Sequence, residues 1–230
     1  DELDGYLAAH PDLRRRIHVH YVPRVQHRRL ERLWPPAYYW TYRRWHQDAY
    51  RLAVELHQRE RFDLAHQLTM VGFREPGYLW QLGIPFVWGP VGGMGFFPWR
   101  FLGATGVYGA VYFAAYNLLN WLDMNCLARP RKAARAAGNA LISVTPENRA
   151  GALKYWHCDS TVLAEVGLPA TPAGACRPRA DGEPLRLVWS GQHTPGKALN
   201  LGLHALSRLG DAPGWQLENL GQGTQTGRWQ

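Results

Sequence analysis

The chain has 230 residues, of which 46% are hydrophobic and 19% are charged. This composition excludes an intrinsically disordered protein, because enough apolar side chains are present to build one large core or two smaller ones. The formal net charge of +8 comes almost wholly from arginine, since only three lysines occur: Lys132, Lys154 and Lys197. Two interpretations stay open, a solvated basic surface or attraction to a phosphate-rich partner such as anionic lipid. No nucleic-acid-binding motif accompanies the charge, so we expect no nucleic-acid partner.

The three cysteines, Cys126, Cys158 and Cys176, are widely spaced and form no CxxC pair. They indicate neither a disulfide framework nor a zinc site, and they favour the reducing cytoplasm. HExxH and EF-hand motifs are also missing from the sequence. The sequence starts without methionine and stops at GQGTQTGRWQ, without a closing helix. We therefore expect a fragment of a longer protein.

The first half of the chain predicts strands separated by helices. Residues 16–23 (RIHVHYVP) alternate apolar and polar side chains, which predicts a strand. From Pro36 the apolar residues step by three and four, which predicts a helix ending near Arg61. We then expect a strand at FDLAHQLT (62–69), a brief helix over 76–82 and a strand at IPFVWG (84–89).

Residues 101–122 contain no charge and approach the roughly 20 residues that span a bilayer. Three glycines and two asparagines dilute their hydrophobicity. We therefore expect a helix that is buried or lies in a membrane interface, not one that spans the bilayer.

The second half repeats the alternation. We expect a basic helix over 129–137, a strand at NALISVT (139–145), a helix opened by Pro146, and a strand at STVLAEVG (160–167). The sequence thus predicts an α/β domain over 1–167 with a largely parallel sheet. Residues 168–184 are rich in Pro, Gly and Ala and predict a linker. A strand at LRLVWSG (185–191), a helix over 198–209 and a strand at WQLENLGQG (215–223) then predict the beginning of a second α/β domain over 185–230.

Ligands of α/β domains usually bind where parallel strands end. In the first domain we predict that the following residues face the ligand cleft: His66, Gly89, Pro90, Gly92, Gly93, Glu165 and Gly167. Glycines let backbone N–H groups approach a ligand with no side chain between them. The alternative is that these glycines serve tight packing, that the histidine is structural and that the glutamate belongs to a plain charged loop.

In the second domain a strand ends at Gly191 and a helix begins near Lys197. Such a junction points free N–H groups and the positive end of the helix dipole at one place, which favours an anion there. Lys197 adds a full positive charge. Gly221 and Gly223 follow the next strand, where they permit close backbone approach or form a plain turn.

Three stretches, in this order, resemble bacterial glycosyltransferases of family 4, the glycosyl transferases group 1. They are FDLAHQLTMVGFREPGYLWQLGIPFVWGPVGG (62–93), ALISVTPENRAGALKYW (140–156) with VLAEVG after it, and LRLVWSGQHTPGKALNLGLHALSRL (185–209). The resemblance implies a GT-B fold, in which two Rossmann-like domains face each other across a cleft. It places the acceptor on the first domain and the nucleotide-sugar donor on the second. It also implies transfer with retention of configuration and without metal, since basic side chains and helix N-termini stabilise the diphosphate leaving group.

Two departures from the family affect the predicted site. Gln192 stands where the family usually carries arginine, so Lys197 would supply the positive charge alone. The donor-binding set is therefore Gly191, Gln192, Lys197, Gly221 and Gly223. The family's catalytic Glu-x7-Glu pair belongs later in the second domain and is not in this sequence. The catalytic residues thus stay unassigned, and we expect this piece alone to be inactive.

The expected function is that of a retaining glycosyltransferase, which transfers a sugar from a nucleotide-diphosphate sugar to a glycan or lipid-linked acceptor. We expect no cofactor. The basic surface and the uncharged stretch 101–122 favour an anionic membrane surface as a partner, with the protein peripheral on the cytoplasmic face. The alternative is a non-catalytic GT-B-like module that binds a sugar or a partner, which Gln192 indicates.

Overall fold

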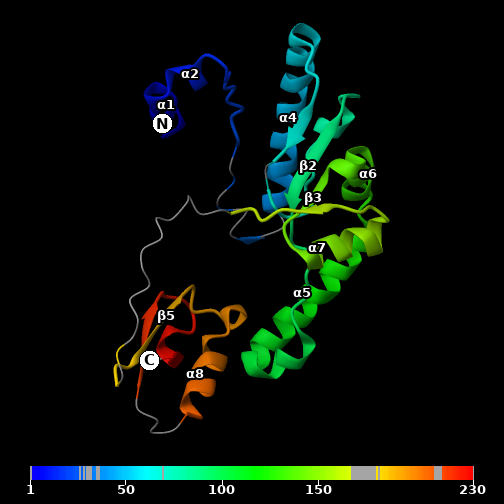
Figure 1. Ribbon diagram of the computed structural model, residues 1–230. Coiled ribbons are helices and arrows are strands. Elements are labelled where there is room, and N and C mark those ends of the chain that lie inside the picture. The colour runs from blue at the N-terminus through cyan, green and yellow to red at the C-terminus, as the bar shows by residue number, and fades with distance from the viewer. Residues whose placement is uncertain are drawn as a thin grey trace. The chain divides into compact units, whose positions relative to one another are not determined.

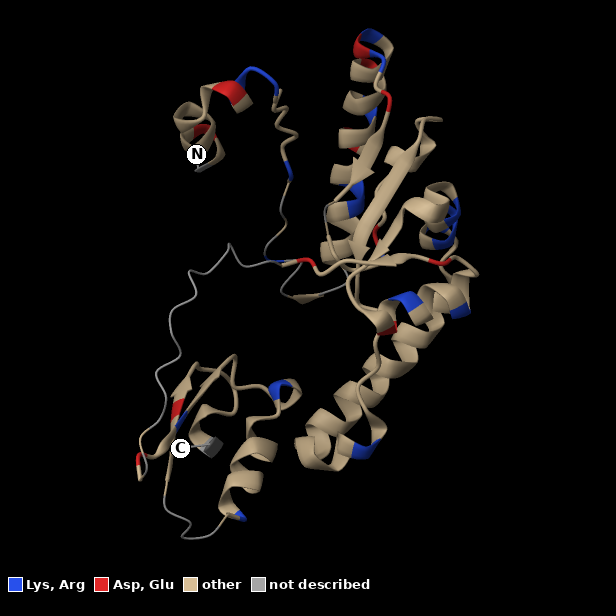
Figure 2. Cartoon of the chain, viewed as in Figure 1, with Lys and Arg blue, Asp and Glu red and all other residues tan. Residues whose placement is uncertain are grey.

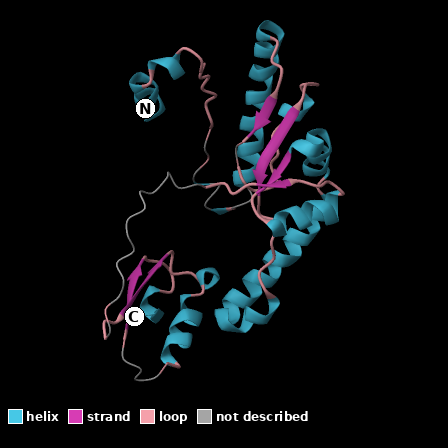
Figure 3. Cartoon of the chain, viewed as in Figure 1, coloured by secondary structure: helices cyan, strands magenta, loops and turns pink. Residues whose placement is uncertain are grey.

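The computed structural model describes residues 2–25, 27, 29, 33–34, 37–68, 70–166, 180, 182–209 and 214–229. The chain divides into two compact units, Asp1–Gly93 with Leu127–Leu163 and Met94–Cys126 with Ala164–Gln230. Each unit contains a parallel sheet (Figure 3), so the predicted α/β class is confirmed. Most of the predicted linker, 168–184, lies outside the described residues.

The first unit is built on a four-stranded parallel sheet in the order β1-β2-β3-β4 (Figure 1). Its strands are β1 (Ala65–Gln67), β2 (Phe86–Val91), β3 (Leu141–Ser143) and β4 (Thr161–Val162). The helical elements of this unit are α1 (Glu2–Ala9), α2 (Pro11–Arg14), α4 (Ala37–Glu60), η1 (Leu79–Gln81), α6 (Ala128–Ala137), η3 (Gly138–Ala140), α7 (Pro146–Gly151) and the π-helical turn η4 (Ala152–Trp156). The predicted helices at α4 and α6 and the one opened by Pro146 are confirmed.

Aromatic side chains fill the core beneath this sheet. Trp88 of β2 stacks on Trp156 of η4 with ring centroids 5.7 Å apart, and Phe73 lies 5.8 Å from the same ring. All three side chains are at most 1% exposed. The buried alanines of α6, Ala133 and Ala134, let its backbone approach β2 closely. The sheet is therefore fixed by large rings and small helix residues together.

The predicted strand at 16–23 is wrong. Residues 17–25 form no regular secondary structure and join no sheet, and Ile17 and Tyr21 are exposed. Instead this segment runs along α4, where the indole Nε1–H of Trp45 donates to the carbonyl of Val22 at 2.8 Å. Alternation alone is not sufficient for a strand, because a strand also needs a neighbouring strand.

The second unit combines a long helix with a two-stranded parallel sheet. Its elements are η2 (Trp99–Thr105), α5 (Gly106–Cys126), β5 (Leu185–Ser190), η5 (Pro195–Lys197), α8 (Leu199–Ser207), β6 (Trp215–Leu220) and α9 (Thr226–Trp229). β5 and β6 pair in register over their whole length. Residues 94–126, which we assigned to the first domain, group with this unit, because Asn200 donates to the carbonyl of Ala104 at 3.4 Å and Gly196 approaches the ring of Phe113.

Several elements are shorter than the sequence predicts. The helix expected over 76–82 is a single 3-10 turn, and the strand expected over 160–167 spans two residues. The stretch 101–122 divides into η2 and the larger part of α5. No helix in the described parts of the chain is both long and apolar enough to cross a bilayer.

We predict that Gly89→Ala destabilises the protein by roughly 2–4 kcal/mol. The Cβ would overlap the carbonyl oxygen of Ile142 on β3, and the φ of residue 89 is 137°, which L-residues rarely adopt. Urea denaturation should give the difference in unfolding free energy. Gly95→Ala is the matched control, because nothing lies within 4 Å of its Cβ position. Equal stability of the two variants would contradict the packing argument.

Candidate functional site

The glycine-rich segment 89–93 lies at the carboxyl end of β2. Gly89 and Pro90 lie within the strand, which continues two residues further than the sequence predicts. The N–H of Gly92 donates to the carbonyl of Val71 at 2.6 Å, and its own carbonyl accepts from Phe73 at 3.1 Å. Gly93 is exposed, with a φ of 81°. At Gly89 and Gly92 the missing side chain thus serves contacts within the protein, whereas Gly93 presents backbone to the surface.

The other predicted cleft residues are dispersed. Nε2 of His66 lies 3.0 Å from the carbonyl oxygen of Gly89, so Nε2–H donates and the imidazole links β1 to β2. Glu165 is exposed after β4. Gly167 lies outside the described residues. The structure therefore brings His66 together with Gly89 at one sheet edge.

In the second unit, the glycines that follow β5 and β6 lie in close contact with the neighbouring loop. The N–H of Gly191 donates to the carbonyl of Leu220 at 3.0 Å. A side chain at Gly221 would overlap the carbonyl oxygen of Gly191, and one at Gly223 would lie 2.6 Å from that of His193. Gly191, Gly221 and Gly223, which belong to the predicted donor-binding set, thus lie close together, and the absence of side chains allows close backbone contact there.

His193, which we did not single out from the sequence, is the centre of this loop pair. Its side chain is buried, and its Nε2–H donates to Oδ1 of Asn219 at 2.9 Å. Nδ1 accepts from the hydroxyl of Thr226 at 2.9 Å, and that hydroxyl accepts from the N–H of Gly223 at 2.9 Å. This chain of hydrogen bonds ties β5, β6 and the first turn of α9 together.

Lys197 and Gln192 are exposed beside these glycines in sequence. The helix does not begin at Lys197, because Ala198 adopts a left-handed conformation with a φ of 54°. Lys197 therefore ends the short turn η5, and α8 starts two residues later at Leu199. The ammonium group and the N-terminus of α8 still lie close together along the chain, which is the arrangement that favours an anion.

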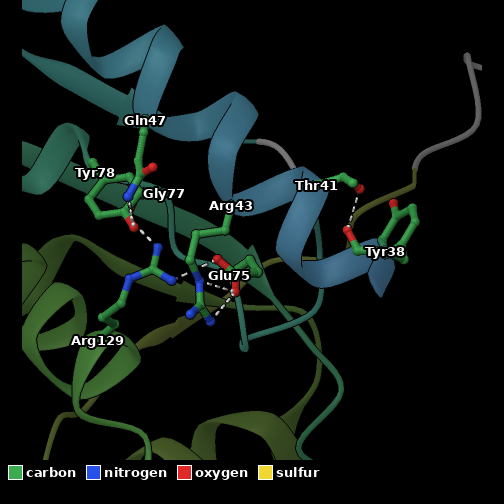
Figure 4. Close-up of polar contacts among 8 residues, drawn as sticks. All are labelled: Tyr38, Thr41, Arg43, Gln47, Glu75, Gly77, Tyr78 and Arg129. Atoms are coloured by element: carbon green, nitrogen blue, oxygen red, sulfur yellow. Dashed lines mark hydrogen bonds and ion pairs between the residues drawn. The ribbon is translucent and has the colours of Figure 1, made fainter. Parts of the chain in front are cut away.

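A buried polar cluster around Glu75 was not predicted from the sequence (Figure 4). Glu75, in the loop after β1, is 1% exposed. Its Oε1 accepts from Nη2 and Nε of Arg43 on α4 at 2.7 and 3.1 Å, and its Oε2 accepts from Nη1 of Arg129 on α6 at 2.8 Å. The hydrogen bond to Glu75 raises the pKa of Arg43.

Aromatic and imidazole rings surround the cluster. The Arg129 guanidinium lies 4.4 Å from the ring centroid of Tyr78, whose hydroxyl accepts from Gln47 at 3.2 Å. His46, one residue before Gln47 on α4, is 4% exposed, and its Nε2 lacks a hydrogen-bond partner among the described residues. Burial, and secondly the charge of Arg129, lowers the pKa of His46 to about 4. The imidazole is therefore neutral at pH 7.

Both oxygens of Glu75 are occupied by guanidinium groups, so the carboxylate acts as a clamp between three segments and not as a base. Arg43 and Arg129 are separated from it by 32 and 54 residues along the chain. No local pattern links such positions. The one available signal was a glutamate next to Arg74 in the stretch FREPGY.

No protein-family model matches the chain, and neither a curated protein nor a solved structure does. Within the described ranges, no three His, Cys, Asp or Glu side chains are grouped so that they could hold a metal ion.

We predict that Glu75→Gln lowers the unfolding free energy by roughly 2–4 kcal/mol, because two guanidinium groups would lose their shared counter-ion. Chemical denaturation at neutral pH should measure this. Asp48→Asn is the matched control: it breaks the exposed pair with Arg51 and should cost no more than about 1 kcal/mol. If the two variants lost equal stability, the clamp would have no special role.

His46 predicts a specific pH dependence. Its pKa is about 4 in the folded chain, below the 6.5 of an unperturbed histidine, so the unfolded chain binds the proton first. Stability from neutral His46 is complete above about pH 6.5 and is lost as the pH falls towards 4, by up to roughly 3 kcal/mol. His46→Gln cannot titrate, so its unfolding free energy should fall less over this interval. Parallel denaturation curves for the two proteins at every pH would refute this assignment.

Proposed function

We propose that this chain is part of a nucleotide-sugar-dependent glycosyltransferase of the GT-B type, which transfers a sugar with retention of configuration. The donor diphosphate would bind at the strand-end loops of β5 and β6. The acceptor, a glycan or a lipid-linked saccharide, would bind at the carboxyl edge of the first sheet. This assignment rests on the resemblance of residues 62–93, 140–156 and 185–209 to glycosyltransferases of family 4.

The observation that carries the proposal is the β5–α8–β6 unit. Its strands are parallel and in register, and Gly191 and Gly221 meet where they end. Exposed Lys197 lies in the connection that leads to α8. A helix N-terminus and an ammonium group are features that stabilise a diphosphate as its negative charge develops during sugar transfer.

The first unit supplies the second surface. Exposed Gly93 follows Gly92, whose backbone is hydrogen-bonded on both sides. His66, on β1, lies beside Gly89, on β2. A rigid strand end with exposed backbone suits the recognition of a sugar, whose hydroxyl groups need closely placed donors and acceptors. His66 and Gly93 are therefore the residues we assign to the acceptor side.

A non-catalytic sugar-binding module is the second candidate, and Gln192 favours it, because an amide cannot neutralise a leaving group. The two candidates differ in catalysis and not in donor binding. A Glu-x7-Glu pair in the second domain of the longer protein, together with sugar transfer, would decide for the enzyme. Binding without transfer would decide for the module.

We predict that the chain binds inorganic pyrophosphate and at least one of the UDP-, GDP- and ADP-sugars, and that Lys197→Ala weakens this binding roughly tenfold. Isothermal titration calorimetry measures both. Lys154→Ala is the matched control, because Lys154 lies on η4 of the other unit, over the ring of Tyr155. Its affinity should be unchanged. The proposal fails if none of these ligands binds, or if both variants lose affinity equally.

A further inference from the structure

Helix α5 buries polar side chains and exposes apolar ones. Its two asparagines, Asn117 and Asn120, are at most 1% exposed. Asn117 makes a two-way contact with Phe97, donating to its carbonyl at 2.9 Å and accepting from its N–H at 2.8 Å. Asn120 donates to the carbonyl of Gly95 at 2.9 Å. The polar face of this helix is thus fully used inside the unit, where it holds the segment 95–97.

The opposite face of α5 is apolar and exposed. Residues spaced by three and four along the helix put their side chains on it: Val107, Tyr108, Val111, Tyr112, Ala115, Leu118, Leu119 and Leu122. Val107 and Tyr108 are 85% and 86% exposed, and Val111 is 66% exposed. We call these eight residues the α5 outer face. Figure 2 shows α5 almost wholly in the colour of uncharged residues. A patch of this kind on a folded protein marks a surface that contacts something apolar.

The net charge of the chain selects the partner. Within residues 94–126, which carry the α5 outer face, the charged residues are Arg100 and Asp123 alone. A second copy of the chain would bring the same +8 net charge to the contact, which opposes self-association, whereas anionic lipid headgroups attract it.

The exposed aromatic residues on and near the α5 outer face are of the types that are common at lipid surfaces. Exposed Tyr108 and Tyr112 lie on the α5 outer face, Trp121 is exposed at its margin, and Trp99 is 60% exposed on η2. Tyrosine and tryptophan are enriched at the level of lipid headgroups, where their rings are buried in the apolar boundary and their polar atoms stay hydrated. Exposed apolar side chains on one helix face enter such an interface through burial of their apolar area.

We propose that the α5 outer face is a membrane-docking surface, which inserts into the headgroup and acyl-chain boundary of an anionic bilayer. Asn117 and Asn120 set its orientation by holding the opposite face to residues 95–97. This inference does not depend on sugar transfer, because it concerns only the surface of α5.

Flotation with vesicles tests the surface. The protein should bind vesicles of phosphatidylcholine and phosphatidylglycerol in a ratio of about 3:1 more tightly than vesicles of phosphatidylcholine alone, and less tightly as salt rises from roughly 0.05 to 0.5 M. Leu119→Glu should lower the partition coefficient about tenfold or more. Leu209→Glu is the matched control, since Leu119 and Leu209 are 57% and 54% exposed, and it should bind like the wild type.

Three results would overturn the proposal: Leu119→Glu binding as tightly as the wild type, an equal loss in Leu209→Glu, or no binding of the wild type to either vesicle. A wild-type dimer in sedimentation equilibrium that Leu119→Glu dissociates would assign the α5 outer face to a second copy and would also overturn it. Circular dichroism should show that both variants keep their helix content. Pyrophosphate affinity, measured on the same variants, should not change, so failure here is distinct from failure of the proposed function.

Discussion

The carboxylate of Glu75 is the charge on which the first unit depends. An ionised carboxylate that is 1% exposed is costly unless its oxygens are paired, and here Arg43 and Arg129 pair one oxygen each. The three residues come from α4, from the loop after β1 and from the first turn of α6. One ionic contact thus connects two helices of this unit to the loop that follows β1.

Some glycines of this protein permit close packing, and others expose their backbone at the surface. Gly89 and Gly92 permit contacts with β3 and with residues 71–73, and Gly221 permits a contact with Gly191. Gly93 is exposed and remains available to a ligand. A glycine-rich strand end is therefore compatible with packing and with binding at the same time. The rigid packing of one glycine holds its neighbour in place, which is what a binding loop requires.

Apolar patterning was sufficient for α4, β5 and β6, whose apolar residues recur along the element, and for β2, which begins in a short continuous apolar run. It failed at residues 16–23, since alternation cannot show whether another strand lies alongside. It could not reveal Glu75 with Arg43 and Arg129, which are distant in sequence. Composition predicted that 101–122 is buried or interfacial. The inward direction of Asn117 and Asn120 depends on residues 95–97, and no pattern within the helix encodes it.

The hydrogen-bond chain through His193 has a mechanical consequence for the second unit. Gly223, Thr226, His193 and Asn219 are linked in series, while the backbone of Gly191 is in contact with Leu220 and Gly221. A shift of either loop would therefore break or strain a contact that the other loop makes. The end of β6 is joined to the start of α9 by side-chain hydrogen bonds through His193, in addition to the pairing of β6 with β5.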